Sequence, residues 1–356
     1  MRDALTQLGF QAVADCEDTF CVDMRAPVML LQDMLLWIKK PHQDDPEVKD
    51  VVLRTRPKLR RALCAMFPGQ LVLCFDSEML NQVVMERVQK ANGVEDVPAG
   101  VRRLGPYMCV PYGKILSNEI VPNTVTKTLH AEKRFDADIK NFTIVEYPGY
   151  SQLQTQARTL RSFHRPLLLV DDFLHKGYRI EKLDKVFREE HLAIDRIIVV
   201  VMSGNGKDLM QVQGRQAECE YFIPNLRYWL TESLLYPFIG GDSVGERDMT
   251  EHMLPSINLV LPYYYPNFMP EVSDANILNF SRVALGNALE IMGVLERRHQ
   301  RIFNTSLTIL RLGEALQQPR LPDKGECMNY DFSRPASDYL AEDLRQIERI
   351  CRRERE

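Results

Sequence analysis

One stretch, residues 165–180, sets tight limits on what this chain can fold into. It reads Arg165-Pro-Leu-Leu-Leu-Val-Asp-Asp-Phe-Leu-His-Lys-Gly-Tyr-Arg-Ile180: an apolar run that ends in two acids, a short loop with one glycine, and the start of an amphipathic helix. A buried strand followed by a loop and a helix is typical of an open α/β sheet, in which ligands bind at the carboxyl ends of the strands. The acids could hold sugar hydroxyls or a metal ion, and the loop and helix start could hold a phosphate.

The rest of the chain supports an α/β fold in three successive parts. Apolar runs at 108–112, 142–147, 167–170 and 196–202 alternate with amphipathic segments at 151–163 and 180–191. Continuous apolar strands that alternate with helices predict a parallel sheet covered by helices on both faces. We expect a small N-terminal α/β unit at 1–100, with a buried helix at 28–38. The main α/β domain is expected at 105–245, and a helical C-terminal region at 246–356.

Composition excludes several classes of function. The 356 residues are 45% hydrophobic and 26% charged, which is typical of a soluble globular protein with more than one domain. A formal net charge of −4 argues against a broad nucleic-acid-binding surface. No apolar run approaches the roughly 18–20 residues that span a bilayer, so no membrane partner is expected. The first residues lack the apolar core of a signal peptide, and we expect a cytoplasmic location.

Cysteine and histidine spacing gives no metal motif. The eight cysteines are scattered without a C-x-x-C pair, and the seven histidines show no H-E-x-x-H spacing. Reduced thiols are therefore expected, and a metal site made by protein ligands alone is not.

The segment Leu167–Arg179 resembles the phosphoribosyl-pyrophosphate motif of type I phosphoribosyltransferases. That motif has a hydrophobic strand, two acids, two variable residues, and a loop rich in threonine and glycine. Asp171 and Asp172 match the acids, and Gly177 matches a loop glycine. The resemblance extends over residues 105–245 and implies a phosphoribosyltransferase-like core. It also implies that the acids contact ribose hydroxyls, directly or through magnesium, and that loop amides cradle a 5′-phosphate.

The loop departs from the family pattern. His175-Lys-Gly-Tyr-Arg179 replaces the usual hydroxyl residues and second glycine. Lys176 and Arg179 could compensate, because both bind phosphate through charge-assisted hydrogen bonds. Tyr178 places a side chain where glycine would let a ligand approach. The resemblance thus nominates the whole loop, including His175 and Gly177, as substrate-binding; the alternative is a polar turn whose acids cap the next helix.

Three lysines outside this loop are further candidates. Lys127 and Lys133 lie in the polar segment 121–135, between the first two strands of the main domain. In the resembled family this region contacts pyrophosphate, and a basic residue there stabilises the departing charge. Lys127 therefore joins Asp171 and Asp172 as a catalytic candidate, and Lys133 is a substrate-binding one. Lys207 follows the strand at 196–202 and is expected at the same edge of the sheet. For each lysine, the alternative is an ordinary surface position.

Two functions of different classes follow. The first is a divergent phosphoribosyltransferase, in which a nitrogen base displaces pyrophosphate by charge-stabilised glycosyl transfer. The second is a non-catalytic module that binds a nucleotide or a sugar phosphate. The chain also resembles bacterial proteins described as cytidylyltransferase-related; it has no H-x-G-H motif, so nucleotidyl transfer would belong to another domain or protein. Homo-oligomerisation is expected through the C-terminal helices or the aromatic segment Leu261–Phe268.

Overall fold

The structure is a computed structural model, and it describes residues 11–12, 23–98, 101, 103–117, 119–136, 139–245, 254–323 and 330–353. Contacts divide the chain into two compact units. Unit 1 comprises Met1–Phe75, Phe135–Ile139 and Arg227–Glu356, and unit 2 comprises Asp76–Arg134 and Lys140–Leu226. Unit 1 thus contains segments from both ends of the chain. The boundaries 1–100, 105–245 and 246–356 stay predictions.

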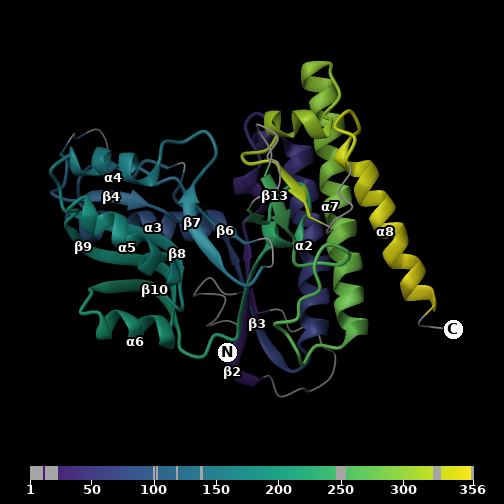
Figure 1. Cartoon of the computed structure of the whole chain (residues 1–356), viewed down its shortest axis with the longest axis horizontal. Coiled ribbons are helices and arrows are strands. Elements are labelled where there is room, and N and C mark those ends of the chain that lie inside the picture. The colour runs from purple at the N-terminus through teal and green to yellow at the C-terminus, as the bar shows by residue number, and fades with distance from the viewer. Residues whose placement is uncertain are drawn as a thin grey trace. The chain divides into compact units, whose positions relative to one another are not determined.

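A five-stranded sheet forms the centre of unit 2 (Figure 1). Its strands are β4 (Met108–Pro111), β5 (Val125–Thr126), β8 (Leu167–Leu174), β9 (Ile194–Ser203) and β10 (Ala217–Ile223). The strand order is β10-β9-β8-β4-β5, and every neighbouring pair is parallel. Leu167 to Leu169 and Val199 to Val201 have no exposed surface, as expected for strands covered on both faces. The predicted parallel-sheet α/β core is confirmed, although the predicted strand at 142–147 is not part of this sheet.

Helices flank this sheet, and two of them begin at side-chain caps. They are α3 (Ser77–Ala91), α4 (Leu153–Arg161), α5 (Tyr178–Glu189) and α6 (Gly204–Val212). Asp76 caps α3 by accepting hydrogen bonds from two backbone amides, and Ser203 caps α6 by accepting one from Gly206. Two further strands, β6 (Ala131–Phe135) and β7 (Phe142–Glu146), are neighbours in a separate sheet.

The order of the five parallel strands reverses between β4 and β8. The chain passes from β4 outward to β5, returns to β8 on the other side of β4, and then continues through β9 to β10. In open α/β sheets, ligands bind outside the carboxyl ends of the strands at such a reversal. The ends of β4 and β8 are therefore the first place in unit 2 to look for a site.

Unit 1 combines long helices with short strands. Its helices are α2 (Pro46–Met66), α7 (Asp274–Phe303) and α8 (Ala336–Arg353), and α7 packs against both of the others. One sheet has the order β1-β3-β2-β11, from β1 (Gln11–Ala12), β2 (Asp23–Gln32), β3 (Gln70–Asp76) and β11 (Tyr228–Thr231). The remaining strands are β12 (Asp242–Val244), β13 (Leu254–Ile257) and β14 (Arg320–Pro322). The helical C-terminal region is confirmed, and none of the described helices is both long and apolar enough to cross a membrane.

The prediction of a helix at 28–38 is wrong. Residues 28–31 belong to β2, where Val28 to Leu31 pair in parallel with Tyr228 to Thr231 of β11, and a 3₁₀ helix follows at Met34–Trp37. An apolar run of this length is compatible with either a buried helix or a buried strand. The partner strand lies about 200 residues along the chain, so local sequence carries no trace of the pairing.

Candidate functional site

The two acids of the motif lie inside strand β8 and not after it. Asp171 is paired with Val199 of β9, and the pairing continues through Leu174 and Met202. The sequence had placed the end of the strand at Val170. Successive side chains of a strand leave opposite faces of the sheet, so the two carboxylates point to different surroundings.

Asp171 is held by Arg179 on the helix that follows. Its Oδ1 accepts a hydrogen bond from Arg179 Nη1 at 2.7 Å and another from the backbone amide of Asp172 at 2.9 Å. Burial raises the pKa of Asp171 to about 6, although the Arg179 guanidinium beside it acts in the opposite direction. Oδ2 has no hydrogen-bond partner among the described residues, so one oxygen of a buried carboxylate remains available.

Asp172 holds the loop that follows β4. Its Oδ2 accepts a hydrogen bond from the backbone amide of Lys114 at 2.7 Å, and its Oδ1 accepts one from Ile115 at 3.0 Å. A Cβ on Gly113 would lie 2.4 Å from Asp172 Oδ1, so the close approach of loop and carboxylate requires glycine at this position. Both oxygens of Asp172 are thus occupied by backbone donors.

Tyr112 completes the cluster around Asp171, although no sequence motif singled it out. It directly follows β4, it is almost fully buried, and the Arg179 guanidinium lies 6.0 Å from the centre of its ring. Burial, followed by the charge of Asp171, raises the pKa of Tyr112 well above its ordinary value. Its hydroxyl has no hydrogen-bond partner in the described part of the chain. Its position at the end of the strand next to β8 was the only available sequence signal.

The loop between β8 and α5 is short and partly exposed. His175 Nδ1 lies 2.7 Å from Ser203 Oγ, its ring stacks on Phe173, and burial lowers its pKa. Gly177 has a φ of 66°, in the left-handed region that favours glycine, and it precedes α5 without any side chain capping the helix. Lys176 is exposed, and it has no hydrogen-bond or ion-pair partner in the described structure. Tyr178 is half-exposed.

The three lysines outside the loop lie at different places in unit 2. Lys127 is exposed and directly follows β5, which β4 separates from β8. Lys133 on β6 lies 4.7 Å from the centre of the Phe142 ring, which in turn contacts the ring of Tyr178 at the start of α5. Lys207 on α6 lies 5.2 Å from the centre of the Phe222 ring.

Of the predicted residues, Asp171 and Arg179 are therefore in direct contact. Lys133 and Tyr178 both contact the ring of Phe142. No contact recorded for the described residues joins Lys127 or Lys207 to Asp171. Arg179 is engaged by Asp171, which leaves Lys176 as the unpaired cation of the loop.

The described carboxylates do not fit a magnesium site that uses both acids. Among the described residues, no three histidine, cysteine or acidic side chains gather in a way that could hold a metal ion. Asp172 has both oxygens engaged by backbone amides, and one oxygen of Asp171 is engaged by Arg179. Magnesium usually takes one or two carboxylates together with substrate phosphates, and of the four oxygens of this acid pair only Asp171 Oδ2 has no hydrogen-bond partner among the described residues.

The fold and site together define an α/β protein with a polar cluster at the strand-order reversal of a parallel sheet. No family model and no curated protein matches the chain. Among solved structures, a purine phosphoribosyltransferase from Pyrococcus horikoshii is similar at 12% identity and a TM-score of 0.24, over 43% of this chain and 86% of that one. An adenine phosphoribosyltransferase from Thermoanaerobacter pseudethanolicus is similar at 13% identity and a TM-score of 0.25, over 44% of this chain and 92% of that one.

The UMP synthase of Leishmania donovani is similar at 15% identity and a TM-score of 0.25. The match covers 50% of this chain and 37% of that protein, so it spans well under half of the synthase. At TM-scores this low, the similarities do not define the function, which has to be argued from strand order and side-chain geometry.

Proposed function

We propose that unit 2 binds a phosphorylated sugar or a nucleotide at the carboxyl ends of β4 and β8. One observation carries the proposal: beside the reversal of strand order, the buried carboxylate of Asp171 accepts a hydrogen bond from Arg179 in the first turn of α5, a helix without a side-chain cap. Sheets of this kind bind ligands at such a point. A phosphate is favoured there because the first amides of a helix lack intrahelical partners and carry partial positive charge.

Each part of the ligand has a matching group. Asp171 Oδ2 can accept a hydrogen bond from a sugar hydroxyl, while Arg179 keeps that carboxylate ionised and oriented. The first amides of α5 and the unpaired ammonium of Lys176 can hold the phosphate. The neighbouring helix α6 is already capped by Ser203, so α5 is the better phosphate site of the two.

Binding without turnover is the function that the geometry supports best. Both oxygens of Asp172 already accept hydrogen bonds from the loop after β4, and the loop hydroxyls of the resembled family are missing. A second candidate is phosphoribosyl transfer, in which the C1–oxygen bond to pyrophosphate breaks and a bond from a base nitrogen to C1 forms. It is favoured by the lysines at 127 and 133, which could neutralise the departing pyrophosphate.

Titration calorimetry tests the binding site. We expect phosphoribosyl pyrophosphate or a nucleoside monophosphate to bind, and Lys176→Gln to weaken binding about tenfold, since a charge-assisted hydrogen bond contributes about 1.5–3 kcal/mol. Lys182→Gln is the matched control, because Lys182 is an exposed cation within α5, the helix that follows the loop of Lys176. Equal affinities for the two variants would contradict the proposal. Titrations with and without magnesium show whether the ion takes part in binding.

An assay for released pyrophosphate separates the two candidates. The wild-type protein is incubated with phosphoribosyl pyrophosphate, magnesium and a panel of purine and pyrimidine bases. Binding without pyrophosphate release supports the binding module. Release that depends on one base, and that is lost in Lys127→Gln, would instead establish the transferase.

A further inference from the structure

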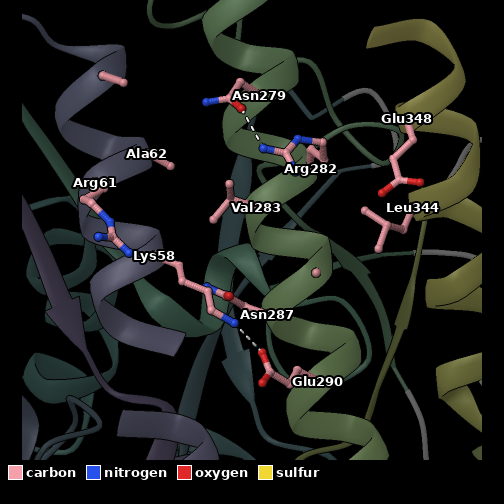
Figure 2. Close-up of a pocket in the computed structure, with 12 residues that line it drawn as sticks. Lys58, Arg61, Ala62, Asn279, Arg282, Val283, Asn287, Glu290, Leu344 and Glu348 are labelled. Carbon is pink, nitrogen blue, oxygen red and sulfur yellow. Dashed lines mark hydrogen bonds and ion pairs between the residues drawn. The ribbon is translucent and has the colours of Figure 1, made fainter. Parts of the chain in front are cut away.

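Unit 1 contains a polar hollow among α2, α7 and α8, shown in Figure 2. Its volume is about 480 Å³, within the roughly 300–1,000 Å³ that is usual for small-molecule sites. Every residue that lines it belongs to unit 1, so it is separate from the site proposed at the sheet of unit 2.

Small side chains keep this hollow open. Ala62 and Ala65 on α2 face Gly286 on α7, and a Cβ on Gly286 would meet no atom within 4 Å. Val283 and Leu344 supply apolar wall. The walls therefore leave a space that is large enough for a compact organic molecule and only partly apolar.

Two guanidinium groups in the hollow have no acidic partner. Lys58 is neutralised by Glu290, whose carboxylate lies 2.7 Å from its ammonium. Arg282, in contrast, donates only to the uncharged side chain of Asn279, at 3.0 Å. Arg61 is exposed and has no hydrogen-bond or ion-pair partner in the described chain. Because Arg282 is partly buried and has no acidic partner, its guanidinium favours binding of an anion from solution.

The hollow also presents acceptors. Asn287 is 1% exposed, and its Nδ2 donates to the carbonyl oxygen of Thr55 and to the hydroxyl of Tyr236. Its Oδ1 has no partner among the described residues, although a buried amide oxygen normally has one. Glu348, on the α8 wall, is partly buried and likewise has no partner in the described structure.

We propose that this hollow binds a small amphoteric metabolite, one that carries a carboxylate or phosphate together with an amino group. Arg282 would hold the anionic group, and the amino group would donate to Asn287 Oδ1, which has no partner among the described residues. A simple anion without a donor would leave this acceptor without a ligand partner, and it would bind more weakly for that reason.

The choice of probes tests this chemistry. Glutamate and phosphoethanolamine carry an amino group, whereas their counterparts glutarate and ethyl phosphate do not. With calorimetry on the full chain, we expect at least one aminated probe to bind at millimolar or lower concentration, about tenfold more tightly than its counterpart without the amine. The carboxylate and phosphate probes decide which anion is preferred. No binding by any aminated probe at about 10 mM would overturn the proposal.

Three variants locate the binding. Arg282→Gln should weaken the best probe about tenfold or more, and Gly286→Leu should abolish binding by filling the open space. Leucine is a stronger helix former than glycine, so the second variant should remain folded. Arg345→Gln, an exposed position on α8 that does not line the hollow, is the control and should bind like the wild type. Wild-type affinity in both Arg282→Gln and Gly286→Leu would place the ligand elsewhere and overturn the assignment.

Discussion

At the scale of single residues, the two adjacent acids of β8 have different tasks. Asp171 lies beside Arg179 and Tyr112, and its Oδ2 has no partner among the described residues. Both oxygens of Asp172 accept hydrogen bonds from the backbone amides of residues 114 and 115. The difference arises because neighbouring residues in a strand point to opposite faces. The motif treats the pair as equivalent, whereas in the structure Asp172 holds the loop and only Asp171 has an oxygen without a partner among the described residues.

The structural task of Asp172 gives a direct prediction. Asp172→Ala removes two hydrogen bonds to a carboxylate, and it should lower the free energy of unfolding by about 1–3 kcal/mol. Denaturant unfolding measures the loss, and hydrogen exchange should show faster exchange at residues 113–117. Asp208→Ala, an exposed acid on α6, is the control and should change stability little. Equal stability of the two variants would show that the contacts with Lys114 and Ile115 contribute nothing measurable.

At the scale of elements, a buried histidine pair joins a short 3₁₀ helix, His42–Asp44, to α7. His42 Nε2 lies 3.2 Å from His299 Nδ1, and both side chains are fully buried. His299 Nε2 lies 3.3 Å from Glu314 of a second 3₁₀ helix, Ile309–Glu314. Burial lowers the pKa of both histidines, and the charge of His299 lowers that of His42 further. The charge of Asp45 raises the pKa of His42, and that of Arg298 lowers it. For His299, the charge of Glu314 raises the pKa, and that of Arg311 lowers it.

The sign of the resulting pH dependence follows from linkage. A histidine whose pKa is lower in the folded state binds fewer protons there than in the unfolded state, where the pKa is about 6.5. The free energy of unfolding is therefore highest above about pH 6.5, and it falls as the pH drops from there toward the pKa values of the two histidines in the folded state. His299→Gln should show a shallower fall between about pH 6.5 and 5 in denaturant titrations. The exposed His164→Asn should keep the wild-type slope; an unchanged slope in His299→Gln would rule out the pair as its source.

At the scale of the whole molecule, unit 1 depends on both ends of the chain. Helix α2 packs against α7, and β2 has β11 as its parallel neighbour, so residues near the start need partners from beyond residue 226. Unit 2 takes all five strands of its central sheet from residues 108–223. Homo-oligomerisation through the C-terminal helices or the segment 261–268, where Tyr265 and Phe268 are exposed, stays a prediction.

This dependence predicts the outcome of a truncation. A chain that stops after residue 226 loses α7 and β11, so the apolar face of α2 is uncovered, while the sheet of unit 2 keeps every strand. Limited proteolysis should then cut within residues 23–75 and leave a resistant fragment close to 76–226. The full-length chain under the same protease is the control. Resistance of the first 75 residues in the truncated chain would show that they fold without the C-terminal segments.

The sequence by itself determined the parallel-sheet core, including the buried strand within residues 165–180. Long buried strands such as β8 and β9 need continuous apolar runs, and amphipathic helices need a regular apolar stripe; both patterns are local and visible in one dimension. The same local information predicted a helical C-terminal region, in which α7 and α8 lie.

Only the tertiary structure decided how the site is divided and how unit 1 is assembled. Whether residues 28–31 form a helix or a strand depends on β11, and whether Asp172 meets a ligand or a loop depends on the end of β4. The residue type of Arg179 suggested a phosphate ligand, whereas in the structure its guanidinium donates to Asp171. Each of these outcomes depends on which distant segment lies alongside, because hydrogen bonds and ion pairs act over a few ångströms of space and not along the chain.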